Sequence, residues 1–81
     1  MSLGVVAAAN VRAERARRKW RQKDLADRLG WSVDTLSNLE TGQRRVTLDD
    51  LVPLCRAFEI TLERLLLGAD PGELAVIGLQ A

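Results

Sequence analysis

The sequence predicts an all-α protein of five short helices, with a sixth left open. Runs of β-branched and aromatic residues, which strands require, are missing, and aromatic residues make up only 4% of the chain. Apolar residues instead recur at helical spacing between capping residues and glycines. The 81 residues suffice for one domain, 1–81, but not for two separate cores. We therefore expect a single compact helical bundle.

The first two helices are expected over residues 8–19 and 22–29. The first segment, beginning at about Ala8, is rich in Ala, Arg and Glu, which favour helix, and it contains no Gly or Pro. The second segment has one apolar stripe that includes Leu25 and Leu29. Gly30 follows it and is typical of a left-handed helix end.

A third helix is expected over residues 33–41, after a turn of about three residues. Ser32 is suited to cap this helix by accepting a backbone N–H, and Asp34 places a negative charge at its positive end. Leu36 and Leu39 supply its buried stripe.

Thr47, followed three positions later by Asp50, resembles a capping box that opens a fourth helix. Pro53 is harmless only within about the first helical turn, so the helix either begins later, at Asp49 or Asp50, or kinks at the proline. The residues expected on its inward face are Leu48, Leu51, Val52, Cys55 and Phe58.

The fifth helix is expected between Thr61 and Gly68, which completes a core of about residues 8–68. Asp70 followed by Pro71 is typical of a helix start, so a sixth short helix remains open there. The tail, 69–81, holds apolar residues that are costly to expose on so small a body, which favours a dimer contact over a flap on the core. These residues are Leu74, Val76, Ile77 and Leu79.

Charge is distributed unevenly along the chain. Residues 1–45 contain ten Lys and Arg against five Asp and Glu, a balance of +5. Residues 46–81 contain two against six, a balance of −4. A basic half suits a surface that faces a polyanion, with a solvated charged helix as the alternative.

Other classes of function are excluded by what the chain lacks. One cysteine and no histidine rule out an intrachain disulfide, structural zinc and histidine-dependent catalysis, so we expect no metal, no cofactor and no enzyme activity. No apolar run approaches the roughly 20 residues that span a bilayer. The opening residues also lack the charged lead of a secretory signal, so we expect a cytoplasmic protein without membrane contact.

Residues 22–39 fit two helices that cross steeply at a tight turn. Such a crossing needs a small residue where the backbones approach, a glycine in the turn and apolar residues that lock the second helix in place. The residues that meet these needs are Leu25, Ala26, Leu29, Gly30, Trp31, Leu36 and Leu39. The product is a rigid helix with one polar side outward, which is what reading a DNA major groove requires.

Here the chain resembles the lambda-repressor and Cro-like helix-turn-helix domains. The resemblance covers about Val11 to Gly68 and rests on VRAERARRKWRQKDLADRLGWSVDTLSNLETG, followed by LDDLVPLCRAFEITLERLLLG. It implies a five-helix, repressor-like transcriptional regulator that binds a near-palindromic operator in double-stranded DNA as a homodimer.

The resemblance also assigns roles to residues. Base edges would be read by Val33, Asp34, Ser37 and Asn38. The amide of Asn38 suits bidentate pairing with adenine, and Val33 suits a thymine methyl. Asp34 either accepts from cytosine N4 or serves only the helix dipole. The DNA backbone would be met by Arg21, Gln22 and Lys23 at the start of the second helix, and by Thr41, Gln43, Arg44 and Arg45 in the loop after the third.

The family pattern further implies a structural salt bridge between Arg15 and Glu40. Arg21 departs from that pattern, since relatives have Ser or Thr there, and this helix end is expected to be less well closed. Trp20 and Trp31 are expected to pack over the second helix rather than stack on bases. Two other functions stay open: an antitoxin whose main partner is a toxin protein, and a protein-interaction module that kept the fold. A protein partner, either a toxin or the transcription machinery, also stays open.

Overall fold

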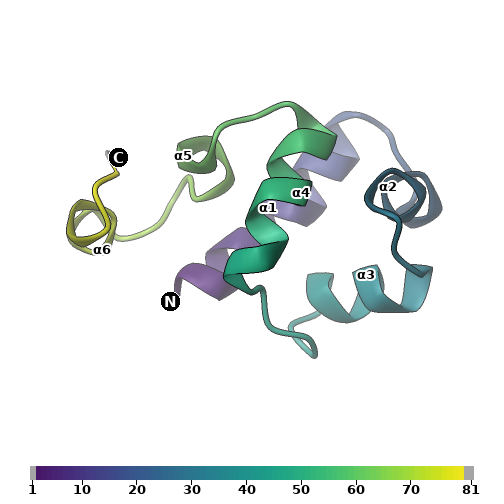
Figure 1. Cartoon of the computed structure of the whole chain (residues 1–81), viewed down its shortest axis with the longest axis horizontal. Coiled ribbons are helices and arrows are strands. Elements are labelled where there is room, and N and C mark those ends of the chain that lie inside the picture. Colours follow the sequence, from purple (N-terminus) through teal and green to yellow (C-terminus); the bar gives the residue numbers. More distant parts are fainter. Residues whose placement is uncertain (1, 80–81) are drawn as a thin grey trace.

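The computed structural model describes residues 2–79, which form six helices and no strand (Figure 1). The all-α prediction is confirmed, and the sixth helix is present. None of the described helices is long and apolar enough to cross a bilayer. The helices are α1 (Leu3–Arg17), α2 (Gln22–Leu29), α3 (Val33–Glu40), α4 (Leu48–Phe58), α5 (Leu62–Leu65) and α6 (Pro71–Val76).

α1 begins at Leu3, so the predicted start at Ala8 is wrong. Ser2 caps the helix, because its Oγ accepts a hydrogen bond of 3.2 Å from the N–H of Val5. Val6 in the added turn is buried in the core. Helix propensity alone missed this turn, which the cap and the burial stabilise together.

The predicted end of this helix at Lys19 is also wrong. α1 ends at Arg17, and Lys19 adopts a left-handed φ of 56°. After this turn, the ring of Trp20 stacks on Phe58 of α4 with centroids 5.7 Å apart, and the Arg28 guanidinium lies 4.1 Å from the Trp20 centroid. Trp20 is therefore a packing residue, as expected.

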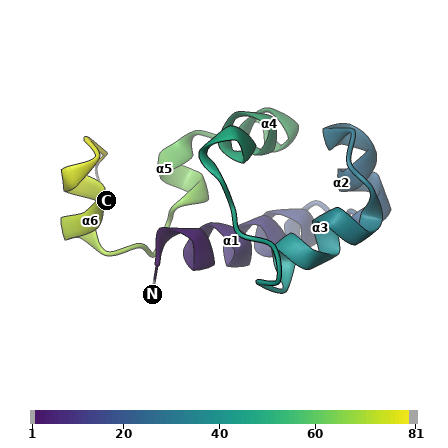
Figure 2. The same ribbon diagram turned by 60° about the horizontal axis from the view of Figure 1, so that its bottom comes forward.

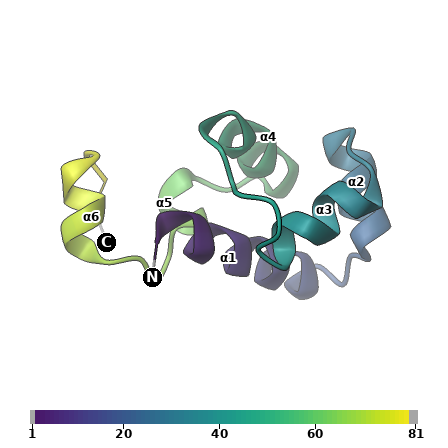
Figure 3. The same ribbon diagram turned by 90° about the horizontal axis from the view of Figure 1, so that it is seen from below.

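One apolar core joins the helices. α1 packs against α3, α4 and α5, while α2 packs against α3 and α4. Figures 2 and 3 show α2 and α3 together at one end of the molecule and α6 at the other. α2 and α3 therefore lie together at one end of the molecule, with their buried sides in the core. Its fully buried leucines are Leu25, Leu36, Leu39, Leu54 and Leu65.

A buried carboxylate links α1 to α5. Glu14, only 1% exposed, accepts hydrogen bonds from Arg17 at 2.8 Å, Arg18 at 2.7 Å and Arg64 at 2.9 Å. Burial alone would raise the pKa of Glu14, but the hydrogen bonds from Arg18 and Arg64 and the charge of Arg17 outweigh it and lower the pKa. The carboxylate of Glu14 thus joins two arginines of the basic half of the chain to one arginine of the acidic half.

α4 begins at Leu48, so the later start at Asp49 or Asp50 is excluded, and Pro53 lies inside the helix. The expected capping box is present. The carboxylate of Asp50 accepts a hydrogen bond of 2.9 Å from the N–H of Thr47.

The inward face of α4 differs from the expected one. Leu48 and Val52 are 85% and 57% exposed, whereas Asp50, Leu54 and Phe58 are buried. The prediction that Leu48 and Val52 face inward is therefore wrong. The buried residues are spaced four apart and begin with Asp50. A prediction from apolar residues alone does not assign a carboxylate to the buried side, so it placed the inward face of α4 wrongly.

α6 lies apart from the other helices (Figure 1). Asp70 caps it by accepting a hydrogen bond of 3.3 Å from the N–H of Gly72. Leu74 is buried, but Val76 and Ile77 are 86% and 52% exposed. The tail is thus anchored on the core by Ala69, Leu74 and the partly buried Leu79, while Val76 and Ile77 stay uncovered.

Candidate nucleic-acid interface

α2 and α3 form a helix-turn-helix unit. Gly30 ends α2 with a φ of 72°, a left-handed conformation that favours glycine. The N–H of Trp31 then donates to the carbonyl of Ala26 at 2.9 Å, and Ala26 itself is 1% exposed. Ser32 caps α3 as expected, since its Oγ accepts a hydrogen bond of 3.1 Å from the N–H of Thr35.

The buried leucines Leu36 and Leu39 hold α3 against the core and direct its other side to solvent. Val33 is 40% exposed, and Asp34 and Asn38 are exposed as well. The residues expected to read bases therefore share the outward side of one helix. Within residues 2–79, no hydrogen bond or ion pair occupies the polar side chains among them: Asp34, Ser37 and Asn38.

Arg15, Gln22 and Glu40 join α1, α2 and α3. Arg15 donates from Nε to Glu40 Oε2 at 2.9 Å and from Nη2 to Oε1 at 3.1 Å, which is the salt bridge that the family pattern implies. The side chain of Glu40 is 2% exposed. Gln22 donates from Nε2 to the same Oε1 at 3.1 Å. This contact orients the Gln22 amide at the start of α2.

At the start of α2, Asp24 Oδ2 accepts from the N–H of Arg21 at 2.8 Å. The Arg21 side chain itself does not cap the helix, because a guanidinium cannot accept a hydrogen bond, so this end has only half of a capping box and is less well closed, as expected. The hydrogen bond from the Arg21 side chain, followed by the one from its N–H, lowers the pKa of Asp24. The two flanking cations expected at DNA also have partners, because Arg21 pairs with Asp24 at 3.2 Å and Lys23 with Asp27 at 3.0 Å.

The loop after α3 contains the other four residues expected at the DNA backbone. Thr41 donates from Oγ1 to the carbonyl of Ser37 at 2.9 Å, and Gln43 is exposed. The side chain of Arg44, 34% exposed, instead forms two hydrogen bonds to the buried Asp50. Arg45 is exposed and has no carboxylate partner within residues 2–79.

Two features beside this loop were not predicted from sequence. Asp50 is a binding partner for Arg44 as well as a helix cap, and only its capping role had a local signal. A groove of about 460 Å³ separates the start of α1 from the loop, with Val5 on one wall and Arg45 on the other. No pattern signalled the groove, since it depends on the unexpected first turn of α1.

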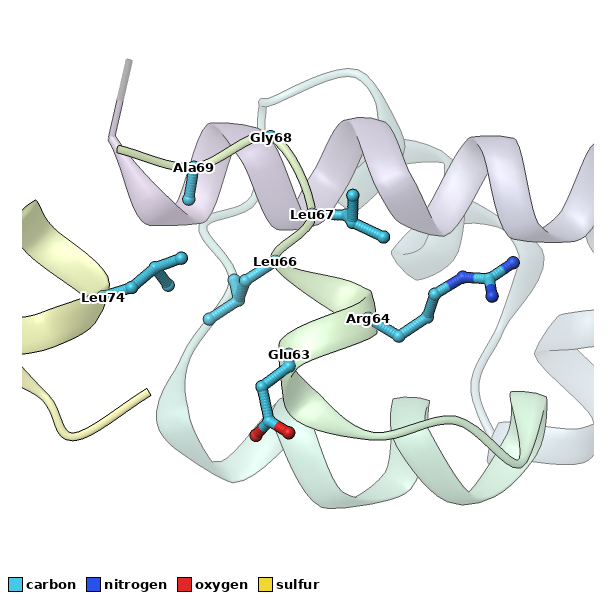
Figure 4. Close-up of a pocket in the computed structure, with 7 residues that line it drawn as sticks. All are labelled: Glu63, Arg64, Leu66, Leu67, Gly68, Ala69 and Leu74. Carbon is cyan, nitrogen blue, oxygen red and sulfur yellow. The ribbon is translucent and has the colours of Figure 1, made fainter. Parts of the chain in front are cut away.

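A second groove, of about 580 Å³, lies between α5 and the segment that leads to α6 (Figure 4). Glu63 and Arg64 point in different directions there, and leucines form much of the lining. Glu63 has no ion-pair partner within residues 2–79, and a single carboxylate provides no acid–base pair. Among the residues that the structure describes, no group of three or more His, Cys, Asp or Glu side chains is arranged to hold a metal ion.

Sequence comparison identifies the family. A family model described as a helix-turn-helix domain matches residues 7–67, three quarters of the chain. The chain belongs to the helix-turn-helix domain family. No protein with a curated description matches it significantly in sequence.

Three solved structures are similar to this helix-turn-helix protein. The clp gene regulator ClgR from C. glutamicum is 27% identical with a TM-score of 0.74, over 83% of this chain and 86% of that one. The hypothetical transcription factor NHTF from Neisseria is 26% identical with a TM-score of 0.73, over 94% and 85%. The restriction-modification controller protein C.AhdI from Aeromonas hydrophila is 28% identical with a TM-score of 0.69, over 75% and 92%. The helix-turn-helix protein thus has the fold of DNA-binding transcription regulators and is not an enzyme.

Proposed function

We propose that this protein is a sequence-specific, repressor-like transcriptional regulator that binds a near-palindromic operator as a homodimer. One observation supports it most directly: α3 is locked by two buried leucines, while its opposite polar side has no partner among residues 2–79. A rigid helix with uncommitted polar groups is the element that enters a major groove.

Each outward residue of α3 has a matching base edge. The Asn38 amide suits the N6 and N7 of adenine, and Val33 suits the methyl of thymine. Asp34 suits cytosine N4, because its carboxylate only accepts hydrogen bonds and Ser32 already caps the helix. Ser37, half-buried beside Asn38, has a hydroxyl that pairs with several base edges.

Backbone contacts would flank α3 on both sides. Gln22 presents the first N–H groups of α2, whose positive end favours phosphate. Beyond α3, the exposed loop residues Gln43 and Arg45 extend the contact, with Thr41 beside them. Arg21 and Lys23 would first exchange exposed carboxylate partners for phosphate, a small loss because exposed pairs contribute little.

The proposed homodimer is formed through the tail. Val76 and Ile77 are exposed beside an apolar groove of about 420 Å³, whose lining includes Leu48, Leu51 and Leu79. A second copy would cover these residues. Because α6 and α3 lie at opposite ends of the molecule (Figure 2), such a dimer would keep both α3 helices free. Their half-sites would lie about 34 Å apart, one turn of DNA.

A duplex selection tests this function. Purified protein is mixed with a random double-stranded library, and bound duplexes are sequenced over several rounds. We expect inverted half-sites whose centres are about one helical turn apart. The Asn38→Ala, Arg45→Ala double variant keeps the buried core and should not enrich them. No enrichment by the wild-type protein would contradict the proposal, and enrichment of single half-sites would contradict its dimeric part alone.

A further inference from the structure

Arg44 has the position of a DNA contact but the surroundings of a structural residue. Its guanidinium donates from Nη1 to Asp50 Oδ2 at 2.8 Å and from Nη2 to Oδ1 at 3.0 Å. The guanidinium also lies 4.9 Å from the centroid of the Trp31 ring. It is thus held between a carboxylate on α4 and an aromatic ring in the turn between α2 and α3.

Asp50 depends on this contact. It is 5% exposed, and within residues 2–79 Arg44 is its one ion-pair partner, while Thr47 donates to it from the backbone N–H at 2.9 Å. A move of Arg44 to a phosphate would leave a buried carboxylate without its counter-charge. That loss exceeds what one exposed ionic contact returns. Arg44 is therefore expected to stay on Asp50 when DNA is bound.

The backbone of Arg44 connects this ion pair to the reading helix. Its N–H donates to the carbonyl of Asn38 at 2.9 Å. The Arg44 side chain thus holds the loop against α4, while the Arg44 main chain holds the loop against Asn38, whose amide is suited to read adenine. Arg45, next in the chain, is directed to solvent and left free for phosphate.

We propose that Arg44 is a positioning residue, which with Asp50 holds Asn38 in register with the base edges and leaves phosphate contact in this loop to Arg45. This inference rests on the proposed DNA-binding function. It replaces the sequence-based expectation that Arg44 itself meets the DNA backbone.

The test compares Arg44→Gln, Asp50→Asn, Arg44→Lys and Arg45→Gln with the wild type. Two duplexes are used: the one recovered by the selection above, and the same duplex with the base pair read by Asn38 changed. The ratio of the two affinities is the discrimination. Each affinity is measured over a range of salt concentrations, and the salt slope is the change in log affinity per unit change in log salt concentration. The temperature is kept well below the lowest Tm of the set, and circular dichroism shows that every variant is folded.

We expect Arg44→Gln and Asp50→Asn to lower the Tm and to reduce discrimination at least about threefold, as for a partly lost bidentate base contact. Arg44→Gln should leave the salt slope unchanged. Arg44→Lys keeps the charge but loses the two-pronged geometry, so it should restore discrimination only in part. Arg45→Gln should reduce the salt slope by about one unit and leave both Tm and discrimination unchanged.

Two results would overturn the inference. A salt slope reduced by one unit in Arg44→Gln, with discrimination intact in Asp50→Asn, would make Arg44 a direct phosphate contact. A lower Tm with full discrimination in both variants would make the ion pair structural only. Failure of the wild-type protein to bind any duplex would reject the proposed function, and with it the positioning role. A non-additive loss of Tm in the Arg44→Gln, Asp50→Asn double variant would then still show the ion pair itself.

Discussion

Arg15 and Glu40, 25 residues apart in sequence, are joined by two parallel hydrogen bonds of 2.9 and 3.1 Å. Glu40 is the last residue of α3, and its side chain is 2% exposed, while that of Arg15 is 17% exposed. The pair therefore anchors the end of the reading helix to α1. A third donor, Gln22 at the start of α2, completes the carboxylate's hydrogen bonds.

Removal of one partner of this pair should destabilise the fold strongly. Glu40→Ala is expected to lower the free energy of unfolding by about 3–5 kcal/mol, because it leaves a half-buried guanidinium without its counter-charge. Urea unfolding followed by circular dichroism measures the loss. The control is Lys23→Ala, which breaks an exposed pair within α2 and should cost less than about 0.5 kcal/mol. Equal losses in the two variants would show that burial of the Arg15–Glu40 pair contributes nothing.

Asn38→Ala should relax sequence preference without loss of general affinity. A bidentate contact to adenine contributes about 1–3 kcal/mol of discrimination between bases. In this proposal the Asn38 side chain does not contact the DNA sugar-phosphate backbone, so general affinity should not change. Binding to the selected duplex and to its single-base variants measures the change. Asn10→Ala is the matched control, since the Asn10 amide binds the carbonyls of Leu65 and Leu67 at 2.6 and 2.9 Å. Asn10→Ala should lower the Tm and keep the base preference. If Asn38→Ala kept the base preference and Asn10→Ala lost it, Asn38 would not be a base-reading residue.

Stability should fall in acid through Glu14 and Asp50. Both carboxyl groups have a lowered pKa in the folded protein. Burial would raise the pKa of each, but hydrogen bonds from Arg18 and Arg64 outweigh it at Glu14, and hydrogen bonds from Arg44 and Thr47 outweigh it at Asp50. Their contribution is therefore complete above the pKa of the unfolded chain, about 4, and is lost as pH falls through the lower folded values. Thermal unfolding between about pH 6 and pH 2 measures this dependence.

Glu14→Gln should lower stability at neutral pH and flatten its dependence on pH. Glu63→Gln is the control, because Glu63 is exposed and has no ion pair within residues 2–79. An unchanged pH dependence in Glu14→Gln would show that the arginine cluster around Glu14 is not a source of acid sensitivity.

Ile77→Asp should convert the proposed dimer to a monomer, because it places a charge on the uncovered apolar side of the tail. Sedimentation velocity over a range of concentrations measures the oligomeric state. Val5→Asp is a matched control, since Val5 is 51% exposed and Ile77 is 52% exposed. If the two variants behave alike, or if the wild-type protein is monomeric at every concentration, the tail is not a dimer interface.

Local patterns predicted most of the helices. Gly30, which follows α2, and the Thr47–Asp50 capping box act within a few residues of the chain, so their spacing is visible in the sequence. The start of α1 and the inward face of α4 differ from what these local patterns predict. There, the outcome depended on the burial of Val6 and Asp50 in the folded chain.

The sequence by itself determined the helical class, the helix-turn-helix segment and the outward residues of α3, because periodicity and capping depend on near neighbours. The tertiary structure decided which cations are free for DNA. Arg44 and Arg45 are adjacent and chemically identical, yet one is paired with Asp50 and the other is exposed. An arginine is paired within the protein or available for phosphate according to whether folding brings a carboxylate beside it. The order of charges along the chain does not contain that information.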